Sequence, residues 1–150
     1  TVIEDYGKTK ENIKMILLGG LSAPIIPYKM IDIKLDYEEL KKENINLGSG
    51  GIIVINNDYD LFEILKENMK FFRYESCGKC TPCREGIREV INILDKFINK
   101  TATEEDLDKL KSLVNLIRNT SFCGLGMYSV TSIISALKYF KEEFNNRIIK

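Results

Sequence analysis

The chain has 150 residues, which is enough for one domain or two small ones. Hydrophobic residues make up 44% and charged residues 29%, a balance typical of a globular rather than a disordered protein. The 22 basic and 22 acidic side chains cancel, so the overall charge does not indicate a nucleic-acid or membrane-surface partner. Histidine is absent, which excludes Ser-His and Cys-His catalysis, HExxH zinc sites and Rieske-type ligation.

The first half of the chain, to about Asn57, has the pattern of a small α+β unit. Two apolar runs, IKMILL at 13–18 and GGIIVIN at 50–56, predict strands. The segments around them are rich in glycine and proline, where the backbone must turn. The segment DYEELKKEN at 36–44 predicts a short helix with Asp36 as its N-cap and Glu39 three residues later. We therefore expect a first domain over residues 1–57.

The second half, residues 58–150, has the pattern of a helical domain. Asp60 and Glu63 form a capping-box pattern before the run LFEILKENMKFF. Thr103 and Asp106 begin another helix in the same way. Apolar residues also recur at helical spacing over 87–98, 107–117 and 130–144. The sequence thus predicts four amphipathic helices that bury their apolar stripes in a bundle.

Three of the four cysteines lie close together, in the stretch ESCGKCTPCREG at 75–86. Cys77, Cys80 and Cys83 are separated by two residues each, so one loop can supply three corners of a tetrahedral iron–sulfur cluster. Cys123, in SFCGLG, is remote in the sequence and can close the fourth corner. The triplet falls between the first and second predicted helices, and Cys123 between the third and fourth. In a bundle these two loops can lie at the same end, where the four thiols would converge.

The surroundings of the cysteines favour thiolates. Cys83 precedes a helix predicted to begin near Arg84, and the dipole of that helix would lower the thiol pKa. Positive side chains would raise a cluster's reduction potential if they point toward it, and the candidates are Arg73, Lys79, Arg84 and Arg88. Three glycines would let the backbone approach sulfur and point amides at it: Gly78, Gly124 and Gly126.

Other uses of the cysteines remain open. Four cysteines can bind structural zinc, although zinc sites usually pair two CxxC knuckles and this chain has one triplet and one single residue. Scattered thiols can also be inert, and the lack of a secretory signal argues against a disulfide. The alternative function is therefore a zinc-stapled binding or structural module. A further alternative is a small-molecule site in the first half, where the sequence shows no convergent polar residues. The spacing favours iron–sulfur over these.

The stretches ESCGKCTPCREG and TSFCGLG resemble the C-terminal part of the NADH-binding, flavin-carrying subunit of respiratory complex I. The same unit occurs in NAD(P)-linked iron hydrogenases and formate dehydrogenases. Upstream, GGLSAPIIP, LDYEEL and LGSGGIIVIN resemble the soluble-ligand-binding β-grasp (SLBB) domain of that family, so the resemblance covers nearly the whole chain. It implies an SLBB-like unit followed by a four-helix bundle. It also implies that one [4Fe–4S] cluster is bound by Cys77, Cys80, Cys83 and Cys123 and relays electrons from flavin toward the clusters of a partner subunit.

The sequence departs from that family in two ways. The domain that holds FMN and NADH has no counterpart, because neither LGG nor LGSGG fits the GxGxxG dinucleotide pattern. The opening TVIEDYGK resembles the middle of the β-grasp unit, so we expect a C-terminal piece of the full subunit. FMN and NAD(H) would then act only through the missing domain, and the chain alone is not expected to be catalytic.

The expected partners are the flavin domain of the parent subunit and the iron–sulfur subunits of a multi-subunit oxidoreductase. We expect no nucleic acid and no direct membrane insertion, because no apolar run is long enough to span a bilayer. The expected location is the cytoplasm, or the membrane periphery within a larger complex. Beside Cys123, we expect some large side chains to shield the cluster and others to form an exposed patch that favours self-association: Phe122, Leu125, Met127 and Tyr128.

Overall fold

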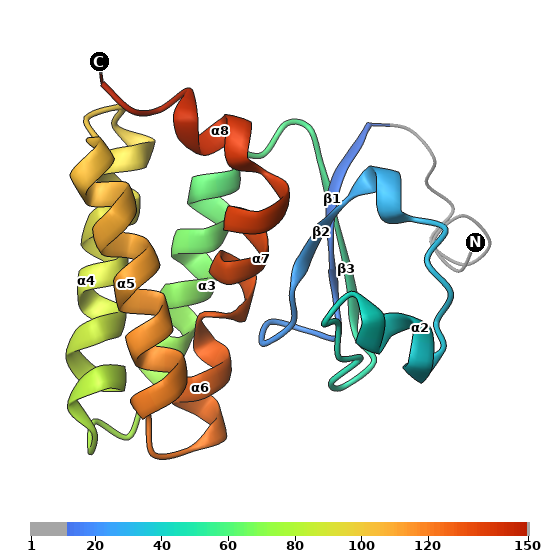
Figure 1. Cartoon of the computed structure of the whole chain (residues 1–150), viewed down its shortest axis with the longest axis horizontal. Helices are drawn as coiled ribbons and strands as arrows, with labels where there is room; N and C mark the ends of the chain where they lie inside the picture. Colours follow the sequence, from blue (N-terminus) through green and yellow to red (C-terminus); the bar gives the residue numbers. More distant parts are fainter. Residues whose placement is uncertain (1–11, 150) are drawn as a thin grey trace.

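The computed structural model describes residues 12–149 of the chain. A small sheet lies between a layer of helices on one side and the short helix α2 (Tyr37–Lys42) on the other (Figure 1). The helical layer contains α3 (Leu61–Glu75), α4 (Thr81–Ile98), α5 (Glu104–Thr120), α6 (Gly124–Ser129), α7 (Thr131–Tyr139) and α8 (Lys141–Asn145). The prediction of a mixed fold with a small sheet and helices is therefore confirmed. The likeness of residues 1–8 to a β-grasp unit lies outside the described residues.

The sheet has three antiparallel strands in the order β2-β1-β3. The central strand β1 (Ile13–Leu18) and the outer strand β3 (Ile52–Asn56) coincide with the two predicted strands. The other outer strand, β2 (Ile25–Pro27), lies in a segment that the sequence predicted to turn. It is followed by a single turn of 3-10 helix, η1 (Tyr28–Met30). Pairing with β1 makes this short segment extended.

Both faces of β1 are buried. Met15 and Leu17 belong to the hydrophobic core shared with the helices, whereas Ile16 and Leu18 belong to a second cluster on the α2 side. A shift in the β1–β3 pairing between Ile13 and Met15 places Ile13 on the α2 side as well. Apart from Lys14, which forms an ion pair with Glu143, the strand is therefore an apolar run rather than an alternating one.

The predicted N-caps of three helices are confirmed. Asp36 accepts hydrogen bonds from the backbone N–H groups at the start of α2, and Asp60 does the same for α3. Thr103 and Asp106 form a reciprocal capping box at the start of α5. These caps fix where the long helices begin. They therefore fix which loops fall at each end of the helical layer.

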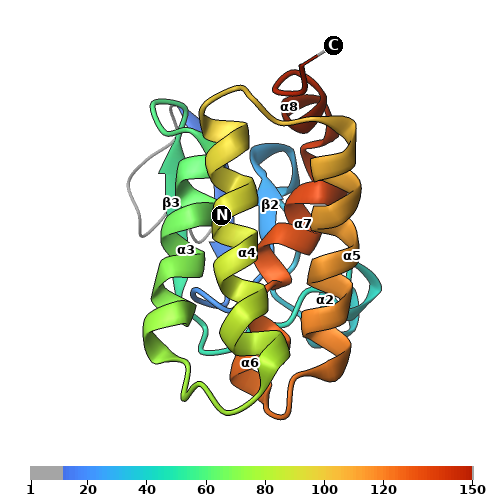
Figure 2. The ribbon, with the colours of Figure 1, turned by 90° about the vertical axis from the view of Figure 1, so that its left-hand side faces the viewer.

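The single last helix expected over 130–144 is wrong. The chain forms two shorter helices there, with a break at Phe140, whose ψ angle of 35° departs from helical geometry, and a third short helix, α6, precedes them and ends at Val130, whose ψ is 5°. The broken path lets α7 lie beside β2, where Ser135 Oγ accepts a hydrogen bond of 2.7 Å from the backbone N–H of Ile25. It also places α8 at the opposite end of the layer from α6 (Figure 2). No helix within residues 12–149 is long and apolar enough to cross a membrane.

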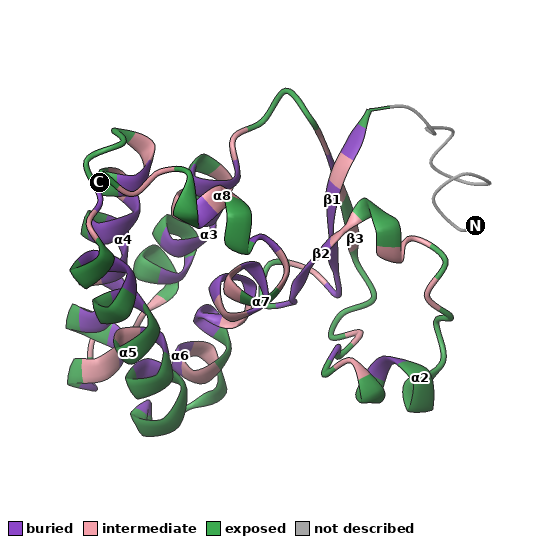
Figure 3. Cartoon of the chain, turned by 45° about the horizontal axis from the view of Figure 1, so that its top comes forward, coloured by how far each residue is buried: buried purple, intermediate pink, exposed green. Residues whose placement is uncertain are grey.

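One hydrophobic cluster runs from the sheet through the whole helical layer, and buried residues face inward from each long helix (Figure 3). At the end where α3 begins, the rings of Phe62, Phe97 and Phe144 lie 5.0 to 5.3 Å apart. Arg147 packs over the Phe62 ring and forms an ion pair with Asp60. This end of the layer, which we call the aromatic end, is closed by direct side-chain contacts.

Candidate functional site

The two cysteine-bearing loops lie together at the end of the helical layer opposite the aromatic end (Figures 1 and 2). One loop, residues 76–80, joins α3 to α4, and the other, residues 121–123, joins α5 to α6. They approach each other beside Gly126, where a Cβ would lie 2.6 Å from the side chain of Ser121 and 3.3 Å from the Cβ of Cys83. All four cysteines fall within the described residues and are free thiols. We call this the cysteine end.

The four thiols differ in their access to solvent. Cys80 and Cys83 are 7% and 5% exposed, whereas Cys77 and Cys123 lie at the surface. Cys83 lies near enough to the other three for their charges to raise its pKa. Among the described residues, no group of three or more His, Cys, Asp or Glu side chains forms a site for a single metal ion. A cluster needs no such closeness, because each thiolate binds a different iron atom.

The helix that follows the triplet begins earlier than the sequence predicted. It starts at Thr81 rather than near Arg84, because the fixed φ of Pro82 suits the first helical turn. Cys80 is therefore the N-cap residue of α4, and Cys83 lies in the first turn. The amides of the helix N-terminus are therefore placed to act on Cys80, one cysteine earlier in the sequence than predicted.

The pKa values of the two buried thiols shift in opposite directions. The pKa of Cys80 is lowered, chiefly by hydrogen bonds from the backbone N–H groups of Phe122 and Cys83. Burial raises the pKa of Cys83, and the neighbouring cysteines raise it further. The expectation of a lowered pKa at Cys83 is therefore wrong, because burial is the largest influence on this thiol. The amides favour the thiolate at Cys80 instead.

Arg84 holds the first loop in place. Its Nη1 donates a hydrogen bond of 2.6 Å to the carbonyl of Gly78, a residue with φ of +73° in the left-handed region that favours glycine. Its Nε binds Glu85, which also pairs with Arg88. The charge of Arg84 is thus partly neutralised, and its contact with the loop is through a backbone carbonyl. Any effect of these arginines on a reduction potential stays a prediction, as it does for Arg73 and Lys79, which are exposed.

Two serines that the sequence analysis did not single out border the buried thiols. Ser76 Oγ lies 3.2 Å from Cys83 Sγ, and the buried Oγ of Ser121 lies beside Gly126, next to Cys83, with no hydrogen-bond partner among the described residues. Each precedes a cysteine by one or two positions in the sequence. A hydroxyl residue directly before a cysteine loop is the signal that could have pointed to them.

The three glycines expected to make room near sulfur have different roles. Gly78 supplies the left-handed turn described above. At Gly126 a Cβ would lie 3.3 Å from the Cβ of Cys83 and only 2.6 Å from the side chain of Ser121, so α6 approaches the cysteine loops too closely for any side chain. At Gly124 a Cβ would make ordinary contacts of 3.6 Å with Tyr128. A close approach to a cysteine is therefore seen at Gly126, whereas the amide of Gly78 donates to Ser76 Oγ rather than to sulfur.

The large side chains beside Cys123 divide between the interior and the surface. Leu125 and Met127 are half-buried, whereas Tyr128 is exposed and Phe122 is 83% exposed. The exposed part of the predicted patch therefore consists of Phe122 and Tyr128. Self-association through these two side chains stays a prediction.

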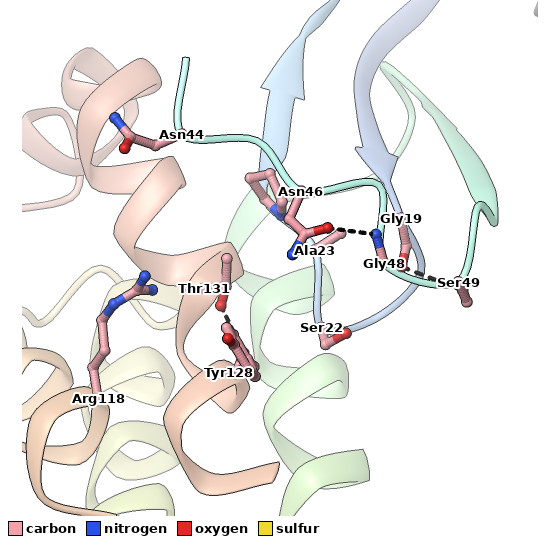
Figure 4. A pocket seen from close by; sticks show the side chains of 11 residues that line it. Gly19, Ser22, Ala23, Asn44, Asn46, Gly48, Ser49, Arg118, Tyr128 and Thr131 are labelled. Carbon is pink, nitrogen blue, oxygen red and sulfur yellow. Dashed lines mark hydrogen bonds between the residues drawn. The ribbon is translucent and has the colours of Figure 1, made fainter. Parts of the chain in front are cut away.

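A cleft of about 390 Å³ opens between the loops of the sheet and the helices α5 to α7 (Figure 4). Its walls carry polar groups from both halves, including Asn46 and Ser49 on the sheet side and Arg118 and Thr131 on the helical side. Tyr128 also lines it, so the cleft borders the helix that follows Cys123. Sequence patterns could not predict this cleft, because its lining residues come from four separate segments of the chain.

The comparison with known families gives a direct match. The family described as the NADH-ubiquinone oxidoreductase-F iron-sulfur binding region matches residues 63–147, which is more than half of the chain and includes all four cysteines. The mitochondrial NADH dehydrogenase [ubiquinone] flavoprotein 1 of Dictyostelium discoideum is 30% identical over 139 residues, 92% of this chain and 29% of that protein. The NADP-reducing hydrogenase subunit HndC of Solidesulfovibrio fructosivorans is 36% identical over 135 residues, 90% of this chain and 28% of that protein.

The solved structures agree in fold. A crystal structure of NAD+-reducing [NiFe]-hydrogenase in the H2-reduced state matches with a TM-score of 0.81 at 24% identity, covering 92% of this chain and 24% of that chain. The chain spans less than a third of the length of these relatives. From the match over residues 63–147, this chain belongs to the family of the NADH-ubiquinone oxidoreductase-F iron-sulfur binding region.

Proposed function

We propose that Cys77, Cys80, Cys83 and Cys123 bind one [4Fe–4S] cluster. The observation that carries this proposal is that the two cysteine-bearing loops lie at the same end of the helical layer and meet beside Gly126, where Ser121 and Cys83 are close together. The two buried cysteines would hold the inner side of the cluster, and the two surface cysteines its outer side. The residues fit such a group, since Gly126 keeps the space beside Cys83 free of a side chain and amides already favour a thiolate at Cys80.

The proposed role is a one-electron relay. When bound, the cluster supplies a one-electron acceptor and donor that no side chain of this protein provides. The residues of the chain bind it, shield it on the side of the core and orient it toward the surface at Cys77 and Cys123. By analogy with the relatives, electrons would come from an NADH-reduced flavin and leave toward the clusters of other subunits.

We further propose that residues 1–57 form an SLBB-like unit and residues 58–150 the four-helix cluster-binding domain. The antiparallel sheet with α2 on one face supports the first part, and the three long helices with the α6–α8 segment support the second. The sheet contributes Met15, Leu17, Ile25 and Ile55 to the core of the helices. The two units are therefore expected to unfold together, with the sheet bracing the back of the helical layer.

The experiment that tests the cluster is reconstitution of the chain with iron and sulfide under anaerobic conditions. We expect brown protein whose iron and sulfide content matches one [4Fe–4S] cluster per chain, with an EPR signal after reduction. Cys80→Ser should lose most of both, whereas Lys79→Gln in the same loop should keep them. A colourless protein that binds zinc without sulfide would contradict the proposal and support the zinc-stapled alternative, because zinc has no redox chemistry.

A second candidate function is suggested by the cleft between the sheet and the helices. A polar cleft of this volume with one guanidinium suits a small anionic ligand such as a carboxylate or phosphate compound. Calorimetric titration with citrate and with inorganic phosphate tests this, with Arg118→Gln as the disabling variant and Arg73→Gln as the matched control. Equal or absent heats in all three proteins would dismiss a ligand of this kind.

A further inference from the structure

Ser76 is placed to donate a hydrogen bond to a candidate ligand sulfur. Its Oγ lies 3.2 Å from Cys83 Sγ and 3.2 Å from the backbone N of Gly78, whose N–H donates to it. A cysteine that binds iron is a thiolate and has no proton to give. The hydroxyl of Ser76 accepts from Gly78 and still has its own hydrogen. With Cys83 as a ligand, Ser76 is therefore the donor and Cys83 the acceptor.

Ser121 occupies the corresponding position on the other loop. The residue is 3% exposed, and its Oγ has no hydrogen-bond partner at ordinary distance within the described part of the chain. Leaving a buried hydroxyl unpaired is unfavourable, so its position calls for an acceptor. A Cβ built at Gly126 would lie 2.6 Å from this Oγ and 3.3 Å from Cys83 Cβ, which shows that the hydroxyl faces the same small space as Cys83.

We propose that the hydroxyl of Ser76 donates a hydrogen bond to the sulfur of Cys83, that the hydroxyl of Ser121 donates one to a buried ligand sulfur beside it, and that both thereby raise the reduction potential of the cluster. The proposal rests on the proposed function, because it needs the cluster. A hydrogen bond to sulfur stabilises the reduced, more negatively charged state more than the oxidised state. Cys80 and Cys83 are buried, so water cannot replace a lost donor there, whereas Cys77 and Cys123 have solvent available. The two serines act through the ligands and are positioning residues.

The test is an EPR-monitored redox titration of the reconstituted chain and its Ser76→Ala and Ser121→Ala variants. We expect each variant to need a reductant ratio about tenfold higher for half reduction, which corresponds to a potential lower by about 59 mV for a one-electron couple. Ser132→Ala is the matched control, since Ser132 is also a buried hydroxyl but lies in α7, where it binds Asn68. Its potential should stay that of the wild type.

The conservative variant Ser76→Thr keeps the donor and should restore the potential lost in Ser76→Ala. A purely structural role would lower the thermal stability of Ser76→Ala and Ser121→Ala without moving the potential, and that result would overturn the proposal. If Ser121→Ala does not assemble a cluster, the pair Ser76→Ala and Ser76→Thr decides: equal potentials overturn the proposal. A wild-type chain without iron and sulfide would refute the cluster itself, an outcome distinct from a loaded protein with unchanged potentials.

Discussion

Replacing Gly126 by alanine tests how closely α6 must approach the cysteine loops. The new Cβ would lie 2.6 Å from both Cβ and Oγ of Ser121. Carbon atoms in contact prefer about 3.5–4.0 Å, so one of the two segments must move by roughly 1 Å. The Cβ of Ser121 is attached directly to the backbone and cannot turn away as the end of a long side chain can. The strain therefore has to be taken up by the loop that carries Cys123.

The size of the effect follows from two opposing terms. Overpacking of a buried contact costs about 1–3 kcal/mol, and this contact belongs in the upper part of that range. Alanine in place of a helical glycine returns up to about 1 kcal/mol. We expect Gly126→Ala to lower the free energy of unfolding by about 1–2 kcal/mol. At Gly124, where the same Cβ would make only ordinary contacts of 3.6 Å, alanine should be neutral or stabilising by up to about 1 kcal/mol.

The assay is urea unfolding of both reconstituted variants followed by circular dichroism, together with iron analysis. The two glycines lie two residues apart in the same short helix. The difference in unfolding free energy between the two variants therefore reports the cost of the close contact at Gly126. Gly126→Ala should also retain less iron, because the strained loop carries a ligand. Equal unfolding midpoints and equal iron contents in the two variants would refute the reasoning.

Four further predictions follow from other parts of the chain. The hydrogen bond from Lys96 holds the pKa of Asp106 below its usual value. The ionised carboxylate therefore stabilises the fold above the pKa of about 3.9 that it has in the unfolded chain. This stabilisation is lost as the pH falls through the pKa of Asp106 in the folded protein. Urea midpoints measured between about pH 3 and pH 7 should therefore show the wild type losing its advantage over Asp106→Asn in the acid part of this range. Arg147→Met should lower the free energy of unfolding by about 2 kcal/mol, measured by urea titration, because it removes charge-assisted bonds to Asp60 at the aromatic end; its iron content should not change. Sedimentation at rising concentration should show self-association that Phe122→Ser weakens, whereas a strict monomer would argue against the exposed patch. The isolated chain should neither bind FMN nor oxidise NADH with ferricyanide as acceptor, and measured activity would refute the absence of a dinucleotide site.

The parts of the fold that sequence patterns predicted are those with a local cause. The caps at Asp36, Asp60 and Thr103 bond to backbone groups two or three residues away, so the sequence alone identifies them. The strand β1 was visible because both of its faces are buried and its residues are almost all apolar. The location of the cysteines in two loops at one end followed from counting helices.

The parts that could not be predicted depend on contacts between distant segments. The strand β2 forms because β1 and Ser135 satisfy its backbone groups, and neither partner is near it in sequence. The breaks at Val130 and Phe140 carry no glycine or proline, so no local signal announces them. The direction of the pKa shift at Cys83 depends on how deeply distant segments bury this thiol, which sequence spacing does not reveal.

The two ends of the helical layer are secured by different means. At the aromatic end, stacked rings and the ion pair of Arg147 join α3, α4 and α8 without any help from a bound group. At the cysteine end, the corresponding bonds between loops would be iron–sulfur bonds. When iron is removed, the rate of amide hydrogen exchange should therefore fall along the helices from the cysteine end to the aromatic end. We expect fast exchange near Cys77 and Cys123 and slow exchange near Phe97. The metal-free chain would then be partly folded, with an ordered aromatic end and a cysteine end that becomes ordered only when the cluster is assembled.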